Sequence, residues 1–191
     1  MWIAVVGSHS TGKSSVLARV GTLLHSNELQ AIQETAREAI SRGYPLGKDG
    51  NATSYAVMIS LQLRAERLAF RNYHRHSLVL CDRTVLDAVA YARANRKHGL
   101  PGVSSEVEEM LLEVSLQEAR LFDLFAYFPV ETSMEEDAVR SVDVEYRLTV
   151  GREIEALLDE FGLPSIRVEG NIEVKAATIA SLFADYRRQS S

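Results

Sequence analysis

The sequence predicts an α/β fold in which a parallel sheet carries helices on both faces. The first observation is that short apolar runs alternate with longer stretches of helical periodicity along all 191 residues. Such alternation is typical of a parallel sheet whose strands are joined by helical crossovers. The second is that the residues suited to chemistry directly follow the apolar runs. They therefore fall at the carboxyl ends of the predicted strands, where such sheets bind their ligands.

The first part of the chain is predicted to contain two strands and two helices. Residues 2–6 form a short apolar run that leads into a glycine, as a buried strand does. Residues 13–27 carry apolar side chains at steps of three and four, which predicts a helix. A second strand is expected at residues 29–33. A short helix at residues 35–42 should end before Gly43.

The middle of the chain is predicted to be mostly helical. Thr53 or Ser54 can cap a long helix that runs to about Arg75. The next apolar run, Ser-Leu-Val-Leu-Cys at residues 77–81, predicts another buried strand. Two further helices are predicted at residues 84–97 and 104–120.

The last part of the chain is predicted to resume the alternation. A strand at residues 124–128 precedes an irregular acidic segment, residues 129–142, which we interpret as an insertion. A helical pattern runs from Tyr146 to Phe161, and Gly162 ends it. The final elements are a strand at residues 165–168 and a helix at residues 172–187.

The composition narrows the class of protein. The net charge is −5 and the sequence pI about 5.6, so we expect no nucleic-acid partner, because such proteins usually carry a basic stripe. No apolar run approaches the roughly 18 residues of a membrane span, so we expect no membrane partner. Residues 1–6 run straight into the glycine loop, so we expect no signal peptide. Cys81 is the only cysteine, which favours a cytoplasmic protein. We expect one domain over residues 1–191.

A phosphate-binding loop lies between the first predicted strand and helix, where the sequence has the pattern Gly-x-x-x-x-Gly-Lys-Ser. Two glycines let the backbone turn so that successive N–H groups point at phosphate oxygens. Lys13 is expected to reach the β/γ-phosphates of an ATP-type nucleotide, and Ser14 to ligate Mg²⁺. We interpret His9 as a loop residue without a chemical role, with a catalytic role as the alternative. The predicted nucleotide-binding residues are Gly7, Ser8, His9, Ser10, Thr11, Gly12, Lys13, Ser14 and Ser15.

Further candidate residues follow the second and third predicted strands. Asp82 occupies the position from which an acid holds Mg²⁺ in P-loop proteins, and Arg83 adds a cation for phosphoryl groups. Glu34 could accept a proton from a substrate hydroxyl, and Arg37, one helical turn later, could bind an anion. The alternatives are structural: helix capping for Asp82 and Glu34, and a surface salt bridge for Arg83.

The acidic segment is followed and interrupted by arginines. It comes after the fourth predicted strand, where P-loop kinases carry a lid, and we expect this lid at about residues 131–145. A lid arginine stabilises charge on a transferring phosphoryl group. Arg140 is the first candidate, followed by Arg147 and Arg152. The alternative is ion pairing with neighbouring acids.

Four segments carry a family resemblance: Gly-Ser-His-Ser-Thr-Gly-Lys-Ser at 7–14, Glu-Thr-Ala-Arg-Glu at 34–38, Cys-Asp-Arg-Thr-Val-Leu-Asp-Ala-Val-Ala-Tyr-Ala at 81–92, and Glu-Asp-Ala-Val-Arg-Ser-Val-Asp-Val-Glu-Tyr-Arg at 136–147. Together they resemble the P-loop kinase-like family that includes the nicotinamide riboside kinase domain of NadR-type proteins. They are more distantly similar to the deoxynucleoside and thymidylate kinases. The first segment is generic to P-loops, and the second and third in this order are more specific.

The resemblance implies a five-stranded parallel sheet in the order 2-3-1-4-5 with a lid. It also implies ATP with Mg²⁺ as phosphoryl donor, and a small hydroxyl-bearing or phosphate-bearing acceptor. Carried over by position, Lys13 and Ser14 serve the phosphates and the metal, and Glu34 or Asp82 is the base. Arg140 is then the lid arginine.

We therefore expect an ATP- and Mg²⁺-dependent kinase that acts on a nucleoside, a nucleotide or a similar metabolite, with a homodimer left open. The resemblance further implies that the loop near Gly170 and Asn171 touches the adenine. The acceptor pocket could include Tyr55, Gln62 and Arg67 of the long helix. The alternative functions are a regulatory ATP- or GTP-binding module without a small-molecule acceptor, and a structural protein with a relic loop.

Overall fold

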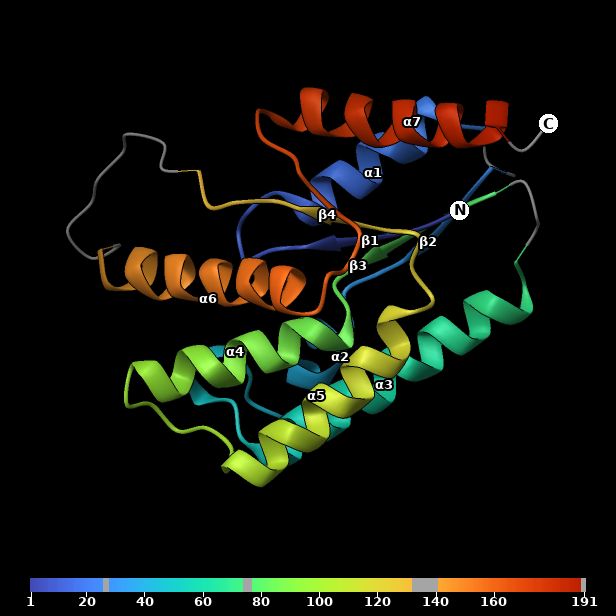
Figure 1. The fold of residues 1–191 in the computed structure, drawn as a ribbon. Helices are drawn as coiled ribbons and strands as arrows, with labels where there is room; N and C mark the ends of the chain where they lie inside the picture. Colours follow the sequence, from blue (N-terminus) through green and yellow to red (C-terminus); the bar gives the residue numbers. More distant parts are fainter. Residues whose placement is uncertain (26–27, 74–76, 132–140, 190–191) are drawn as a thin grey trace.

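Five parallel strands form the centre of the fold in the computed structural model, which describes residues 1–25, 28–73, 77–131 and 141–189. The strands are β1 (Trp2–Val6), β2 (Leu29–Ile32), β3 (Leu78–Asp82), β4 (Leu124–Tyr127) and β5 (Ser165–Arg167). Their order in the sheet is β2-β3-β1-β4-β5, and every pairing is parallel (Figure 1). This confirms the α/β sheet and the strand order expected from the sequence.

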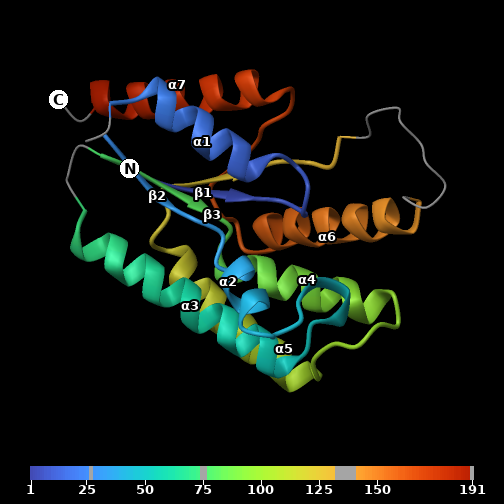
Figure 2. The same cartoon turned by 180° about the vertical axis from the view of Figure 1, so that it is seen from behind.

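Helices cover both faces of this sheet. Helices α1 (Lys13–Leu23) and α7 (Ile172–Gln189) lie on one face, as the two opposite views in Figures 1 and 2 show. The other side holds α2 (Ala36–Ser41), the 3-10 helix η1 (Gly47–Asp49), α3 (Ala52–Arg71), α4 (Val85–Lys97), α5 (Ser105–Ala119) and α6 (Ser141–Glu160). None of the helices in the described ranges combines the length and the apolarity that a membrane crossing requires.

The central strand β1 contributes to both hydrophobic cores. Side chains alternate between the two faces along a strand. Trp2, Ala4 and Val6 pack into the core beneath α3 to α6, whereas Ile3 and Val5 pack into the core beneath α1 and α7. All five are buried. Because both faces of β1 are covered, the strand is an uninterrupted apolar run in the sequence.

Several helix ends differ from the sequence predictions: α3 ends at Arg71 instead of about Arg75, and α6 begins at Ser141 instead of Tyr146. Two further differences have a clear local cause. The N-cap of α3 is Asn51 instead of Thr53 or Ser54: Asn51 has an extended backbone, and its side chain accepts a hydrogen bond from the Ser54 amide at 3.1 Å. The side-chain oxygen of Asn can accept a hydrogen bond from a free amide of the first helical turn as well as a Ser or Thr hydroxyl can. The helix therefore begins earlier than predicted. Helix α1 ends at Leu23, before its predicted end, because the next residue is extended, with φ −107° and ψ 156°.

The carboxyl ends of β1, β2 and β3 bring the predicted site residues to one edge of the sheet. Strand β1 leads into the loop before α1, and β3 ends at Asp82 itself. In the register of the sheet Val5 pairs with Asp82, and Ile32 pairs with Cys81. Glu34, two residues beyond the end of β2, therefore emerges at the same edge as Asp82.

Candidate active site

The loop between β1 and α1 takes a shape that requires its two glycines. Gly7 has a φ of 150°, and a Cβ atom there would lie 2.4 Å from the carbonyl oxygen of Phe128. Gly12 has a φ of 84° and is the N-cap of α1. A side chain at position 7 has no space, and one at position 12 is disfavoured by the left-handed backbone. The loop ends at a helix N-terminus, whose partial positive charge favours anions.

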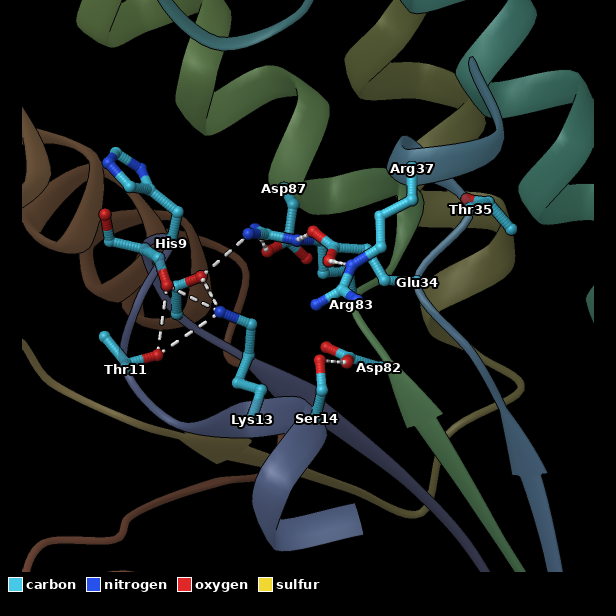
Figure 3. Close-up of polar contacts among 12 residues, drawn as sticks. His9, Thr11, Lys13, Ser14, Glu34, Thr35, Arg37, Asp82, Arg83 and Asp87 are labelled. Atoms are coloured by element: carbon cyan, nitrogen blue, oxygen red, sulfur yellow. Dashed lines mark hydrogen bonds and ion pairs between the residues drawn. The ribbon is translucent and has the colours of Figure 1, made fainter. Parts of the chain in front are cut away.

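Lys13 is folded into this loop. Its ammonium donates hydrogen bonds to the carbonyl oxygens of Gly7 (2.9 Å) and Ser8 (2.5 Å) and to Thr11 Oγ1 (3.2 Å), as Figure 3 shows. The residue is only 5% exposed. Burial, followed by repulsion from the Arg83 guanidinium, lowers the pKa of Lys13 to about 7. The three acceptors of the Lys13 nitrogen are uncharged oxygens, and the carboxylates of Asp87, Asp82 and Glu34 offset the shift only in part.

Ser14 and Asp82 lie side by side, as a shared metal site requires. The Ser14 hydroxyl donates to Asp82 Oδ2 at 2.6 Å (Figure 3). Asp82 is fully buried, and within the described part of the chain its other oxygen, Oδ1, has no hydrogen-bond partner. Burial raises the pKa of Asp82, although the bond from Ser14 opposes the shift. Helix capping, the structural alternative for Asp82, does not apply, because Thr84 is the N-cap of α4.

Arg83 connects three segments at the sheet edge. Its Nε donates to Glu34 Oε1 at 2.6 Å, and its Nη1 donates at 3.2 Å to both the Gly7 carbonyl and Asp87 Oδ1. Its backbone has a φ of 75°, which is uncommon outside glycine and is found at functional sites. The side chain is nearly buried, so the surface salt bridge considered from the sequence is wrong.

Glu34 is an ionised carboxylate at this junction. It accepts hydrogen bonds from Arg83 and, at 3.2 Å, from Arg37 Nε (Figure 3). Burial is the largest influence and favours the neutral acid, but Arg83, Lys13 and Arg37 together outweigh it and hold the pKa of Glu34 below its usual range. Arg37 itself is exposed and pairs with Glu34. The sequence prediction thus placed Glu34, Asp82 and Arg83 in one site.

Four cavities border these residues among the described part of the chain, and one of them, of about 350 Å³, is lined by Glu34 together with residues of β2 and α3. The other three involve the phosphate loop, α7 or a group of tyrosines. The loop cavity, of about 310 Å³, is lined by residues 9–15 with Glu34, Arg37 and Arg83. The α7 cavity, of about 520 Å³, is lined by Thr11, Glu131, residues 170–173 and Lys175, and so includes the predicted adenine contacts Gly170 and Asn171. The tyrosine cavity, of about 350 Å³, is lined by His9, Glu34, Ala36, Ile40, Leu46, Gly47, Lys48, Tyr55, Met58, Arg83, Asp87, Ala88, Tyr91 and Tyr146.

The tyrosine cavity and the loop cavity share His9, Glu34 and Arg83. His9 therefore lies at their boundary, and its amide donates to Tyr91 Oη at 3.0 Å. Of the acceptor-side residues expected on α3, Tyr55 lines the tyrosine cavity. Gln62 and Arg67 line none of the three cavities.

Sequence reasoning missed one group that organises the site and gave a second group a different role. Asp87 forms a capping box with Thr84 and also binds Arg83, and its Thr-x-x-Asp spacing could have revealed the cap. Gln62, expected in the acceptor pocket, is buried behind the site. It accepts from Thr35 Oγ1 at 2.7 Å and donates to the Arg83 carbonyl at 3.2 Å, which ties the segments after β2 and β3 together. No local pattern marks such a role.

The predicted lid lies mostly outside the described residues, and so does Arg140. Of the other candidate arginines, Arg147 on α6 donates from Nε to the His9 carbonyl and from Nη2 to the Ser10 carbonyl, both at 3.1 Å. Arg152 is exposed on the same helix. Arg147 is thus the described arginine of α6 that contacts the phosphate loop.

A comparison with protein-family models finds an AAA domain over residues 2–175. The chain belongs to the AAA domain family. The match includes the phosphate loop, Glu34, Asp82 and Arg83, together with α6. No curated protein matches this AAA domain.

Solved structures share the fold of this AAA domain. NadR protein in complex with NAD and AMP-PNP is 19% identical, with a TM-score of 0.71 over 97% of this chain and 49% of that chain. Deoxyadenosine kinase from M. mycoides is 17% identical, with a TM-score of 0.65 over 99% of this chain and 100% of that one. Thymidylate kinase from Ehrlichia chaffeensis is 13% identical, with a TM-score of 0.62 over 95% of this chain and 98% of that one.

The AAA domain spans about half the length of the NadR chain that it matches. At these identities the likeness shows a common fold. It confirms the P-loop kinase-like fold that the sequence resemblance implies.

Proposed function

We propose that this protein is an ATP- and Mg²⁺-dependent phosphotransferase that acts on a nucleoside, a nucleotide or a similar small metabolite. The observation that carries the proposal is the junction of two cavities at Glu34, Arg83 and His9. A donor in the loop cavity and an acceptor in the tyrosine cavity would meet beside a carboxylate and a guanidinium. Phosphoryl transfer depends mainly on such positioning and on charge stabilisation.

The donor side fits a nucleoside triphosphate. The loop and the Lys13 ammonium would bind the β/γ-phosphates, and the α7 cavity beside Thr11 would take the base. The NadR structure that shares this fold holds AMP-PNP, an ATP analogue. Gly170 and Asn171 are the proposed contacts of the adenine.

Ser14 and Asp82 fit a magnesium site, because a hydroxyl and a carboxylate with one unpartnered oxygen are the ligand types that Mg²⁺ prefers. The described residues contain no cluster of three or more His, Cys, Asp or Glu side chains that could hold a metal, so phosphate oxygens and water would supply most ligands. When bound, Mg²⁺ would neutralise charge on the phosphates.

Glu34 is the better placed of the two candidate bases. Asp82 is bonded to Ser14 and lines neither cavity, whereas Glu34 lines both. An ionised carboxylate there can take a proton from an acceptor hydroxyl as its oxygen attacks the γ-phosphorus and ADP leaves. The same carboxylate would repel an acceptor phosphate, so we favour a hydroxyl-bearing acceptor such as a nucleoside. Arg83 would stabilise the transferring group, and Arg140 remains the proposed lid arginine.

The test is to incubate the protein with ATP, Mg²⁺ and each member of a panel of nucleosides, nucleoside monophosphates and nicotinamide riboside, and to measure ADP. ADP formation that depends on one acceptor supports the proposal. The Lys13→Ala variant, which loses the loop cation, is the negative control. Absence of acceptor-dependent ADP across the panel would contradict the proposal, and acceptor-independent hydrolysis would favour a regulatory nucleotide-binding module.

We further propose a cytoplasmic enzyme, in keeping with a lone cysteine that is buried. We leave a homodimer open as an alternative to a monomer. The molecular mass in solution tests this point directly.

A further inference from the structure

A buried asparagine on α4 joins the wall of the tyrosine cavity to α6. Asn95 has an exposed fraction of 0%. Its Nδ2 donates to the carbonyl oxygens of Gly47 (2.9 Å) and Pro101 (2.8 Å), and its Oδ1 accepts from Tyr146 Oη at 2.6 Å. The side-chain amide thus uses both its donors and its acceptor. It bridges α4 to η1, to the loop before α5 and to α6.

Two of the segments that Asn95 joins form part of the cavity wall. Gly47 and Lys48 of η1 line the tyrosine cavity, and so does Tyr146 of α6. The Lys48 ammonium lies 5.2 Å from the centre of the Tyr146 ring. Asn95 does not line the cavity itself, so it can affect the cavity only through its hydrogen bonds to residues that do.

The same turn of α6 also contacts the phosphate loop. Arg147, the residue after Tyr146, donates to the His9 and Ser10 carbonyls. The His9 ring lies 6.4 Å from the Tyr146 ring, centre to centre. Neighbouring residues of one helix therefore contact both the donor loop and the acceptor wall. A shift of the loop upon nucleotide binding would displace Tyr146, whose hydroxyl is bonded to Asn95.

We propose that Asn95 is a positioning residue that couples the two cavities: through Tyr146 it links occupancy of the phosphate loop to the geometry of η1. The inference rests on the proposed function, because the loop must bind a nucleotide. Coupling of this kind is reciprocal, so an acceptor that orders η1 would tighten nucleotide binding by the same factor.

Hydrogen exchange with AMP-PNP and Mg²⁺ as the probe tests the coupling without knowledge of the acceptor. In the wild-type protein, saturating AMP-PNP should slow amide exchange in residues 44–50 by roughly fivefold, the lower end of typical coupling. Tyr146→Phe, which removes one hydroxyl, and Asn95→Ala should abolish this slowing while AMP-PNP still binds. A purely structural role would speed exchange with and without nucleotide alike and leave the ratio unchanged.

The matched control is Tyr127→Phe. It removes another tyrosine hydroxyl that packs against α6, where a Cβ on Gly151 would lie 3.0 Å from it. This variant should retain the wild-type slowing, and an equal loss would overturn the inference. The inference would also be overturned if the wild-type protein bound AMP-PNP without slower exchange in residues 44–50. Full slowing of exchange in Tyr146→Phe would overturn it as well. Failure of the wild-type protein to bind AMP-PNP would instead overturn the proposed function, and the coupling with it.

Discussion

At the scale of single residues, Arg83 shows how the backbone positions charge in this site. A non-glycine residue with a φ of 75° costs of order 1–3 kcal/mol, which the surrounding structure must offset. The offset comes from a guanidinium that reaches Glu34, Asp87 and the Gly7 carbonyl together. The strained backbone therefore sets one cation at the boundary of the two cavities.

We expect Lys13 to take up a proton when the nucleotide binds. Because its pKa is about 7, the Lys13 side chain is mostly in its neutral amine form at pH 8 when no nucleotide is bound. Phosphate oxygens stabilise the ammonium and raise its pKa in the complex. Between the two pKa values binding takes up a proton, and affinity falls as pH rises, by up to about tenfold per pH unit. Titration calorimetry at pH 8 in buffers of different ionisation enthalpy measures this uptake.

The control for the proton uptake is Lys13→Ala. This variant should lose roughly 1.5–3 kcal/mol of binding free energy, the size of a hydrogen bond to a charged group, together with the proton uptake. Unchanged uptake in the variant would assign the proton to a different group.

Glu34→Gln tests the proposed base. The substitution keeps the size of the side chain but removes its ability to accept a proton. We expect kcat to fall by roughly 10²–10⁴ with the acceptor identified by the panel, while the affinity for ATP changes little. Glu38→Gln is the matched control, because Glu38 is an exposed acid on the following helix that pairs with Arg42. If the two substitutions lowered kcat equally, Glu34 would not be the catalytic base.

Sequence reasoning identified the site residues that follow strands and missed those that act across the chain. Asp82 and Arg83 follow the apolar run at residues 78–81, and Glu34 follows the second predicted strand, so position alone marked them. Gln62 and Asn95 have ordinary positions in helices, and their roles come from carbonyl groups that lie near only in the folded protein.

At the scale of elements, the two glycines of the phosphate loop are required for different physical reasons. Position 7 excludes a Cβ by contact, and position 12 disfavours one by conformation alone, since nothing lies within 4 Å of a Cβ there. Gly12→Ala should therefore cost roughly 1–2 kcal/mol, and Gly12→Asn less, because Asn tolerates the left-handed region. Gly7→Ala should cost roughly 1–3 kcal/mol, and Gly7→Asn at least as much. Urea unfolding measures all four, and relief by Asn at position 7 would contradict the contact argument.

The elements themselves were largely predictable, because periodicity records which faces are buried. Strand β1 is apolar throughout since it has a core on each side, and the amphipathic helices show the step of three and four. The cap of α3 was missed because three polar residues, Asn51, Thr53 and Ser54, compete within one turn. Only the backbone conformation decides which of them accepts the hydrogen bond.

At the scale of the whole molecule, the tyrosine cavity could not be predicted. Its walls come from the phosphate loop, α2, η1, α3, α4 and α6, and no two of its tyrosines share an element. Spacing in the sequence carries no information about such a convergence. The resemblance to kinases implied an acceptor, and the tyrosine cavity is where we propose that it binds.

The two hydrophobic cores should unfold together. We propose that residues 1–191 form one domain, because β1 contributes to both cores. Calorimetry should show one thermal transition with equal calorimetric and van't Hoff enthalpies. AMP-PNP with Mg²⁺ at about 100 times its Kd should stabilise the native state by about 2.7 kcal/mol and raise Tm by roughly 5–10 °C. Lys13→Ala at the same concentration should show a smaller rise. Two transitions, only one of them moved by nucleotide, would show that the two cores unfold separately.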